Sequence, residues 1–167
     1  MMANAAVEIR KSAVISKCGD YRYRLTRYWG PGAMLPFVML NPSTADANID
    51  DPTIRRCMGF AKRSGAGGIV VSNLYAFRAT SPDDMMDAIE PTGPLNESYL
   101  RQIAVEAVAV HFPIVCAWGT HGRDAAGWAT RLFQHEGAQL VCLGKTKDGH
   151  PRHPLYVKGD QPLVPYP

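Results

Sequence analysis

The segment from Leu35 to Leu40 constrains the fold of this chain more than any other. It is almost entirely apolar, it does not alternate with polar residues, and it stops abruptly at the sequence Asn41-Pro42-Ser43-Thr44. A short apolar run without alternation is typical of a strand that is buried on both faces, as in a parallel sheet. Because proline cannot continue a central strand, we expect Asn41 at the strand's carboxyl end, which is where open α/β sheets bind ligands.

The rest of the chain alternates apolar runs with helical patterns. Strands are predicted over 35–40, 69–73, 114–118 and 139–143, and helices over about 52–63, 95–109 and 123–135, with a short helix after Ser81. The first helix has a clear start, because Asp51 can cap it and Pro52 suits its first position. We therefore predict an α/β fold with three layers (α/β/α) and a central four-stranded parallel sheet of order 2-1-3-4.

The N-terminal part differs from this pattern. Residues 12–17 and 21–29 flank the turn Cys18-Gly19-Asp20 and predict an antiparallel hairpin within residues 1–30. The arginines of its second segment are expected on a solvated face. The proline-rich tail over 158–167 is predicted to be irregular, and the whole chain, 1–167, is predicted to form a single domain.

Composition limits the classes of function. Apolar residues make up 46% of the chain and charged residues 20%, which is typical of a globular protein. The net charge of +3 permits contact with phosphates but is low for a protein that coats DNA. There is no apolar run of membrane-spanning length and no signal-peptide core, so we expect a cytoplasmic protein without a membrane partner. The four cysteines are far apart in the sequence, which favours buried free thiols.

Polar or irregular stretches follow all four predicted parallel strands. These are 41–44, Asn73, 118–121 and 150–155. Because parallel strands end at the same edge of a sheet, we expect these stretches to converge and form a site. The alternative is four separate turns, in which the asparagines and serine only cap the local backbone.

The residues at this edge suit recognition of a base. Asn73 offers a donor and an acceptor to a base edge, Tyr75 or Phe77 offers a stacking face, and Arg152 can contact a phosphate. The predicted substrate-binding residues are Ser43, Thr44, Asn73, Tyr75, Phe77, Trp118, His121, Arg152 and Leu155. Structural roles remain open for Asn73 as a turn cap, for Phe77 in the core and for Arg152 on a solvated loop. His121, His150 and His153 lack cysteine or carboxylate partners at metal spacing, so we predict no metal and no cofactor.

Two resemblances rest on these residues. The strings LNPSTADANIDDPTIRRC, SNLYAFRATSP, WGTHG and GHPRHPLY resemble an uncharacterised bacterial family, one of the domains of unknown function. This resemblance covers nearly the whole chain and implies no activity.

The order of the same motifs also resembles, distantly, the uracil-DNA glycosylase superfamily. That resemblance implies a uracil-DNA-glycosylase-like fold in which Asn41 positions the attacking water and Asn73 reads the pyrimidine edge. It also implies that His150 or His153 stabilises negative charge on the base, and that Leu155 wedges into the duplex. Trp118-Gly119 matches the third motif of the superfamily.

The sequence departs from that superfamily at several motif positions. Met39 stands where the superfamily commonly has glycine, and the last motif reads His-Pro-Arg-His-Pro, so either histidine can align with it. Asn41 cannot accept a proton, as an aspartate could.

Two classes of function follow. The first is an N-glycosidic hydrolase that acts on a nucleotide or a DNA base, with Asn41, His150 and His153 as catalytic residues. The second is a non-catalytic binder of nucleotides or modified nucleic acid on the same scaffold. In both classes the predicted partner is a nucleotide or a nucleic-acid base, with DNA or RNA as candidate larger partners. The sequence predicts no oligomeric state.

Overall fold

The apolar run that begins at Leu35 forms a central strand. The structure, a computed structural model, describes residues 6–167. Strand β3 (Met34–Met39) pairs in parallel with β4 (Gly68–Asn73) on one side and with β5 (Ile114–Cys116) on the other, and β6 (Leu140–Cys142) pairs in parallel with β5. Every residue of β4 is buried, as is every residue of β3 after Met34. Burial on both faces explains why these runs lack alternation.

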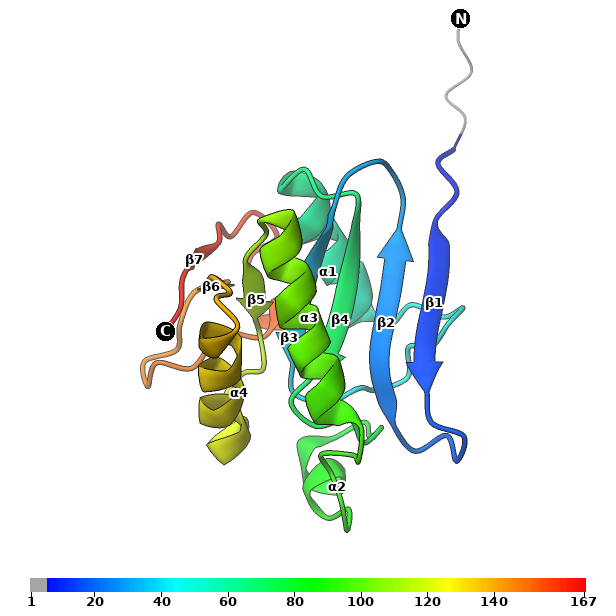
Figure 1. Cartoon of the computed structure of the whole chain (residues 1–167), viewed down its shortest axis with the longest axis vertical. Helices are drawn as coiled ribbons and strands as arrows, with labels where there is room; N and C mark the ends of the chain where they lie inside the picture. The colour runs from blue at the N-terminus through cyan, green and yellow to red at the C-terminus, as the bar shows by residue number, and fades with distance from the viewer. Residues whose placement is uncertain (1–5) are drawn as a thin grey trace, which may run out of the picture.

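Antiparallel strands extend this parallel set at both edges. β1 (Arg10–Ile15) and β2 (Arg22–Tyr28) form the predicted hairpin, and β2 also pairs antiparallel with β4. With β7 (Val164–Pro165), the described residues form one mixed sheet of seven strands in the order β1-β2-β4-β3-β5-β6-β7 (Figure 1). The α/β class is confirmed, but the sheet is not limited to four strands. The reason is that an unpaired outer edge of β4 would leave buried backbone groups without partners.

The C-terminal tail also differs from the prediction. Residues 158–167 were expected to be irregular, yet β7 pairs antiparallel with β6. The N–H of Tyr166 donates to the carbonyl of Leu140 at 3.0 Å. The tail therefore covers the other exposed edge of the sheet, a role that its proline-rich composition did not indicate.

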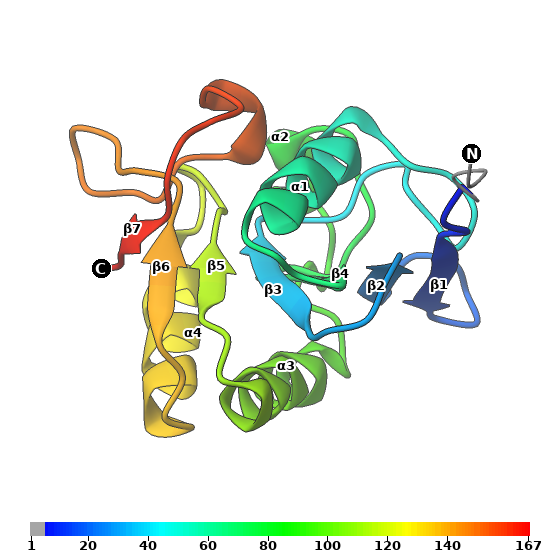
Figure 2. The ribbon, with the colours of Figure 1, turned by 90° about the horizontal axis from the view of Figure 1, so that it is seen from above.

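Helices lie on both faces of the sheet. α1 (Pro52–Arg63) covers one face, and α3 (Asn96–Val110) and α4 (Arg123–His135) cover the other (Figure 2). Each face has its own apolar core, one built with α1 and one built with α3 and α4. α1 begins as predicted, since Asp51 Oδ1 accepts a hydrogen bond from the N–H of Ile54 at 2.8 Å. The short helix α2 (Pro82–Met86) is capped by Ser81 in the same way. None of the helices in the described residues is long and apolar enough to cross a membrane.

The hairpin arginines were expected in solvent, and this prediction is wrong for two of them. Arg22 is 2% exposed and Arg27 is fully buried. The chain after β3 folds back over them, so that Arg22 Nη1 donates to the carbonyl of Ala45 at 2.7 Å and Arg27 Nε donates to Asp50 at 2.6 Å. The carbonyls of this loop need buried donors, and the long arginine side chains supply them.

Candidate functional site

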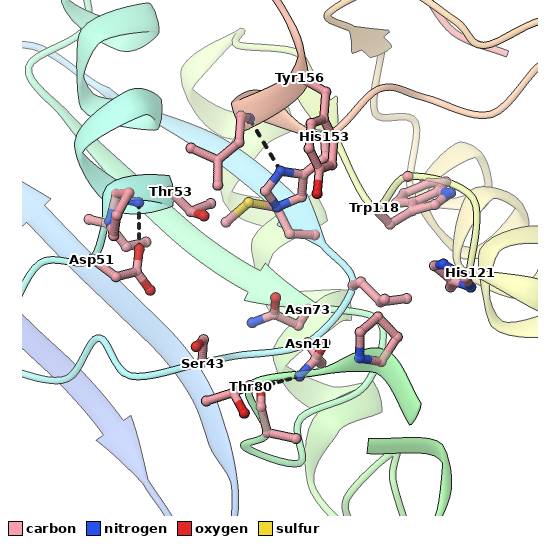
Figure 3. Close-up of a pocket in the computed structure, with 18 of the residues that line it drawn as sticks. Asn41, Ser43, Asp51, Thr53, Asn73, Thr80, Trp118, His121, His153 and Tyr156 are labelled. Atoms are coloured by element: carbon pink, nitrogen blue, oxygen red, sulfur yellow. Dashed lines mark hydrogen bonds between the residues drawn. The ribbon is translucent and has the colours of Figure 1, made fainter. Parts of the chain in front are cut away.

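A cavity of about 570 Å³ opens at the carboxyl ends of the parallel strands. The loops after β3, β4, β5 and β6 and the first residues of α1 line it. The lining includes these residues predicted from the sequence: Asn41, Ser43, Thr44, Asn73, Trp118, His121, Arg152, His153 and Leu155. In Figure 3, Asn41, Asn73 and His153 face the same space, with Asp51 on one side and Trp118 and His121 on the other.

Three predicted site residues lie outside the cavity lining. Tyr75 is buried in the core, and its hydroxyl donates to the carbonyl of Gly122 at 3.3 Å. Phe77 packs edge-on against Tyr21, with ring centroids 5.9 Å apart. His150 is held by its backbone, whose N–H donates to Thr146 Oγ1 at 3.1 Å. Of the two histidines that the sequence left open, only His153 lines the cavity.

Asn73 is the most unusual residue of the cavity. It ends β4, it is 1% exposed, and neither its amide oxygen nor its amide nitrogen has a hydrogen-bond partner among the described residues. A buried amide without partners costs free energy, and nearly all buried polar groups in proteins are paired. Asn73 therefore carries a donor and an acceptor that are available to a ligand or to bound water.

Asn41 is held in one orientation. Its amide nitrogen donates to the carbonyl of Ala79 at 2.9 Å and to that of Pro42 at 3.1 Å. Both donors of the side chain are thus committed, which leaves the amide oxygen as its free acceptor. Such a group can hold a water molecule by accepting its proton in a hydrogen bond, but it cannot remove that proton.

His153 has a defined tautomer. It caps the short 3₁₀ helix η1 (Pro154–Tyr156), and its Nδ1 accepts a hydrogen bond from the N–H of Leu155 at 3.2 Å. Burial lowers the pKa of His153, and the nearby carboxylate of Asp51 opposes this only in part. A neutral imidazole that accepts at Nδ1 carries its proton on Nε2, so His153 can donate one hydrogen bond from that atom.

The position of His153 is fixed from two sides. Arg56 of α1 donates from Nε to the carbonyl of Pro154 at 3.1 Å and from Nη2 to that of Val157 at 2.7 Å. On the other side, the N–H of Gly119 donates to the carbonyl of Pro151 at 2.9 Å and ties the loop after β5 to the loop after β6. Gly119 has a φ of 72°, which favours glycine at this turn.

Sequence reasoning missed two charged residues of the cavity. Asp51 was interpreted only as a helix cap, but it also lines the cavity, and among the lining residues it is the one carboxylate. Arg22 lines the cavity as well, although its sequence context in the hairpin suggested solvent. No local signal could have revealed Arg22, because its position depends on a loop more than twenty residues away. Several hydroxyls complete the lining: Thr53, Thr80, Thr120, Thr146 and Tyr156.

Trp118 brings the indole of the third motif to the same space. It is 1% exposed, and its Nε1 has no hydrogen-bond partner among the described residues. Its ring packs edge-on against Tyr166 of the C-terminal tail, with centroids 5.5 Å apart. Within residues 6–167, the histidine, cysteine and acidic side chains form no group of three or more that could hold a metal ion.

Comparison with known proteins gave one match. Neither the curated proteins nor the solved structures showed a match to this chain. The sequence model of one family, described as "Protein of unknown function (DUF1643)", matches residues 22–155. This range includes β2 to β6, helices α1 to α4 and every cavity residue named above except Tyr156. The chain therefore belongs to the DUF1643 family.

Proposed function

We propose that this protein binds a nucleobase in the cavity and hydrolyses the N-glycosidic bond between that base and its sugar. The unpaired amide of Asn73 carries the proposal. An amide presents a donor and an acceptor side by side, which is the pattern needed to pair with a base edge. A bound base would relieve the free-energy cost of burying this amide alone.

The size and lining of the cavity support a ligand of this kind. A volume of about 570 Å³ lies within the range of small-molecule sites. The lining joins apolar groups such as Leu40 and Trp118 to a few convergent polar side chains. The proposal also includes a fold of the uracil-DNA glycosylase type, since the strand-end residues stand in the order implied by that resemblance.

His153 is proposed to stabilise the leaving base. When the bond between the sugar carbon C1′ and the base nitrogen breaks, the electron pair moves to the base, and negative charge develops on its carbonyl oxygens. The Nε2–H of the neutral His153 can donate a hydrogen bond to such an oxygen. The lowered pKa of His153 favours this role, because the ring stays neutral and keeps its tautomer at neutral pH.

Asn41 and Asp51 are proposed to act on the water. Asn41 can hold a water through its free amide oxygen, and the carboxylate of Asp51 can accept a proton from it. The water oxygen bonds to C1′ as the bond to the base breaks. Solvent later protonates the released base, and Asp51 returns its proton to solvent. One oxygen of Asp51 is engaged by the N–H of Ile54, so the second oxygen is the acceptor.

A second candidate function is binding without catalysis. The observation that favours it is the amide at position 41, which cannot remove a proton. In that case Asn73 and the cavity would recognise a nucleotide or a modified base, and Asp51 would serve only as the cap of α1.

A paired assay tests both candidates. Calorimetry measures binding of nucleosides, nucleotides and short oligonucleotides, and chromatography measures release of free base from nucleotides and from uracil-containing DNA. We expect Asn73→Ala to weaken base binding by about 5- to 150-fold, because the base edge would be left unpaired. If the protein is a hydrolase, the wild type should release free base. Asp51→Asn and His153→Gln should lose this release while they still bind the ligand. Binding without release supports the second candidate, and the absence of both contradicts base recognition.

A further inference from the structure

Arg22 is a buried charge that the protein does not neutralise by direct contact. It is 2% exposed, and no carboxylate among the described residues lies within 4.0 Å of its guanidinium. Arg27 lies on the same strand, is equally buried, and pairs with Asp50 at 2.6 Å. The two arginines therefore differ in pairing: Arg27 has its counter-ion in the protein, and Arg22 does not. Buried charges in proteins are usually paired.

Arg22 lines the cavity, and part of its guanidinium has no partner. Nη1 donates to the carbonyl of Ala45 at 2.7 Å, whereas Nε has no partner and no hydrogen bond from Nη2 is present among the described residues. The Nε–Nη2 edge of a guanidinium can donate two parallel hydrogen bonds, a geometry that matches two oxygens of a phosphate. Arg22 lines the cavity and Arg27 does not.

The charge of Arg22 persists at neutral pH. Burial is the main cause that lowers the pKa of its guanidinium to about 10, with Arg78 and Arg27 lowering it further and Asp51 and Asp46 raising it. A basic side chain whose pKa is lowered by folding destabilises the folded state at every pH where it stays protonated. A bound anion would offset that cost.

We propose that Arg22 binds the phosphate of a small nucleotide whose base is read by Asn73. The inference rests on the proposed function and specifies its substrate class as a nucleoside monophosphate. The start of β2 lies beside the end of β4, because these strands pair antiparallel, so Arg22 and Asn73 reach the cavity from neighbouring strands. The hydroxyls of Ser43 and Thr44, which line the same cavity, can donate to the remaining phosphate oxygens.

The position of Arg22 also favours binding of a free nucleotide over binding of a nucleic-acid strand. A phosphate that reaches a guanidinium 2% exposed must enter the cavity with the base. A terminal phosphate monoester can do so, whereas the phosphates of a strand are diesters whose flanking sugars continue outside. The same site therefore disfavours oligonucleotides.

Calorimetry with matched ligands tests this inference. The probes are uridine, cytidine and thymidine, their 5′-monophosphates, and a short single-stranded oligonucleotide. We expect each monophosphate to bind about 10- to 100-fold more tightly than its nucleoside, because its phosphate adds charge-assisted hydrogen bonds to Arg22. In Arg22→Gln this ratio should fall to about 1–3. Arg22→Lys should keep part of the ratio, and the control Arg27→Lys should keep all of it.

A measurement on the wild-type protein tests the inference without variants, which could misfold. The second ionisation of a phosphate monoester has a pKa of about 6, so the advantage of the monophosphate over the nucleoside should grow between pH 5 and pH 7. A ratio near one in the wild type overturns the inference, as does a ratio that Arg22→Gln leaves unchanged or an oligonucleotide that binds more tightly than the monophosphates. If nucleosides bind in an Asn73-dependent way, the proposed function survives any of these results. If no nucleoside or nucleotide binds, the proposed function fails first.

Discussion

Replacing Asn73 with leucine should stabilise the protein and abolish base binding. Leucine has the same branched arrangement of side-chain heavy atoms as asparagine, so the change removes the two polar atoms without opening a cavity. Both atoms are buried and unpaired among the described residues, which means that their loss breaks no hydrogen bond. A residue kept for stability would show the opposite effect.

The expected gain is small but measurable. An unpaired buried polar group costs about 1–3 kcal/mol, and part of this cost returns when an apolar side chain replaces it. We expect the free energy of unfolding to rise by about 1–2 kcal/mol. For a chain of 167 residues this corresponds to an increase in Tm of about 3–6 °C.

Asn96 provides the matched control. It is fully buried beside the end of β4, and its amide nitrogen donates to the carbonyls of Asn73 and Leu74 at 2.9 and 3.0 Å. Asn96→Leu should therefore lower the free energy of unfolding by about 2–4 kcal/mol, because two buried carbonyls lose their donor. Urea denaturation, with the slope checked for constancy, measures both variants. If Asn73→Leu destabilises the protein as much as Asn96→Leu, Asn73 is a structural residue and the basis of the proposed site is lost.

Three further predictions concern the rim of the cavity. Arg56→Ala should lower the free energy of unfolding by about 1–3 kcal/mol in urea titrations and weaken base binding, because the segment around η1 loses both donors that hold it. Arg55→Ala, at an exposed position, should change the free energy of unfolding by less than about 0.5 kcal/mol. Because folding lowers the pKa of His153, the unfolded state binds more protons than the folded state just below pH 6.5. The free energy of unfolding should therefore rise with pH up to that value. His153→Gln should remove this slope, whereas substitution of the exposed His135 should not. Arg152→Ala should weaken any oligonucleotide binding regardless of base and flatten its salt dependence in anisotropy titrations, and an unchanged salt slope would argue against a phosphate contact.

The elements that local patterns specify were predicted well. The uninterrupted apolar runs at β3 and β4 are buried throughout, and the sequence Asp51-Pro52 begins α1 through a cap within three residues. The strand pairings that the sequence did not reveal lie at the two edges of the parallel set. The pairing of β2 with β4 and of β7 with β6 satisfies edges that exist only once the parallel strands have assembled.

The candidate site was predicted to the extent that it follows from strand ends. Asn41, Asn73 and Trp118 stand at or just after the ends of β3, β4 and β5, so the common edge brings them to one cavity. Tyr75 and Phe77 lie only a few residues beyond β4, yet they pack into the core and against the hairpin. An aromatic residue after a strand can face a ligand or the interior, and the sequence pattern does not distinguish these cases.

Two pairs of buried polar residues show that hydrogen-bond pairing is set over long distances in the chain. Arg22 and Arg27 share a strand, and Asn73 and Asn96 share a contact. Arg27 pairs with Asp50, and the amide nitrogen of Asn96 has two acceptors, although its amide oxygen has no partner among the described residues. Arg22 lacks a partner at Nε and Asn73 at both amide atoms, and these two residues line the cavity. The partner of Arg27 comes from the loop before α1, and the partners of Asn96 come from the end of β4. Because such contacts join segments 20 or more residues apart, no local pattern can show which buried amide or guanidinium will lack them. Asn73 is neutral and Arg22 is cationic, and in the proposed complex the base and its phosphate would supply partners to both.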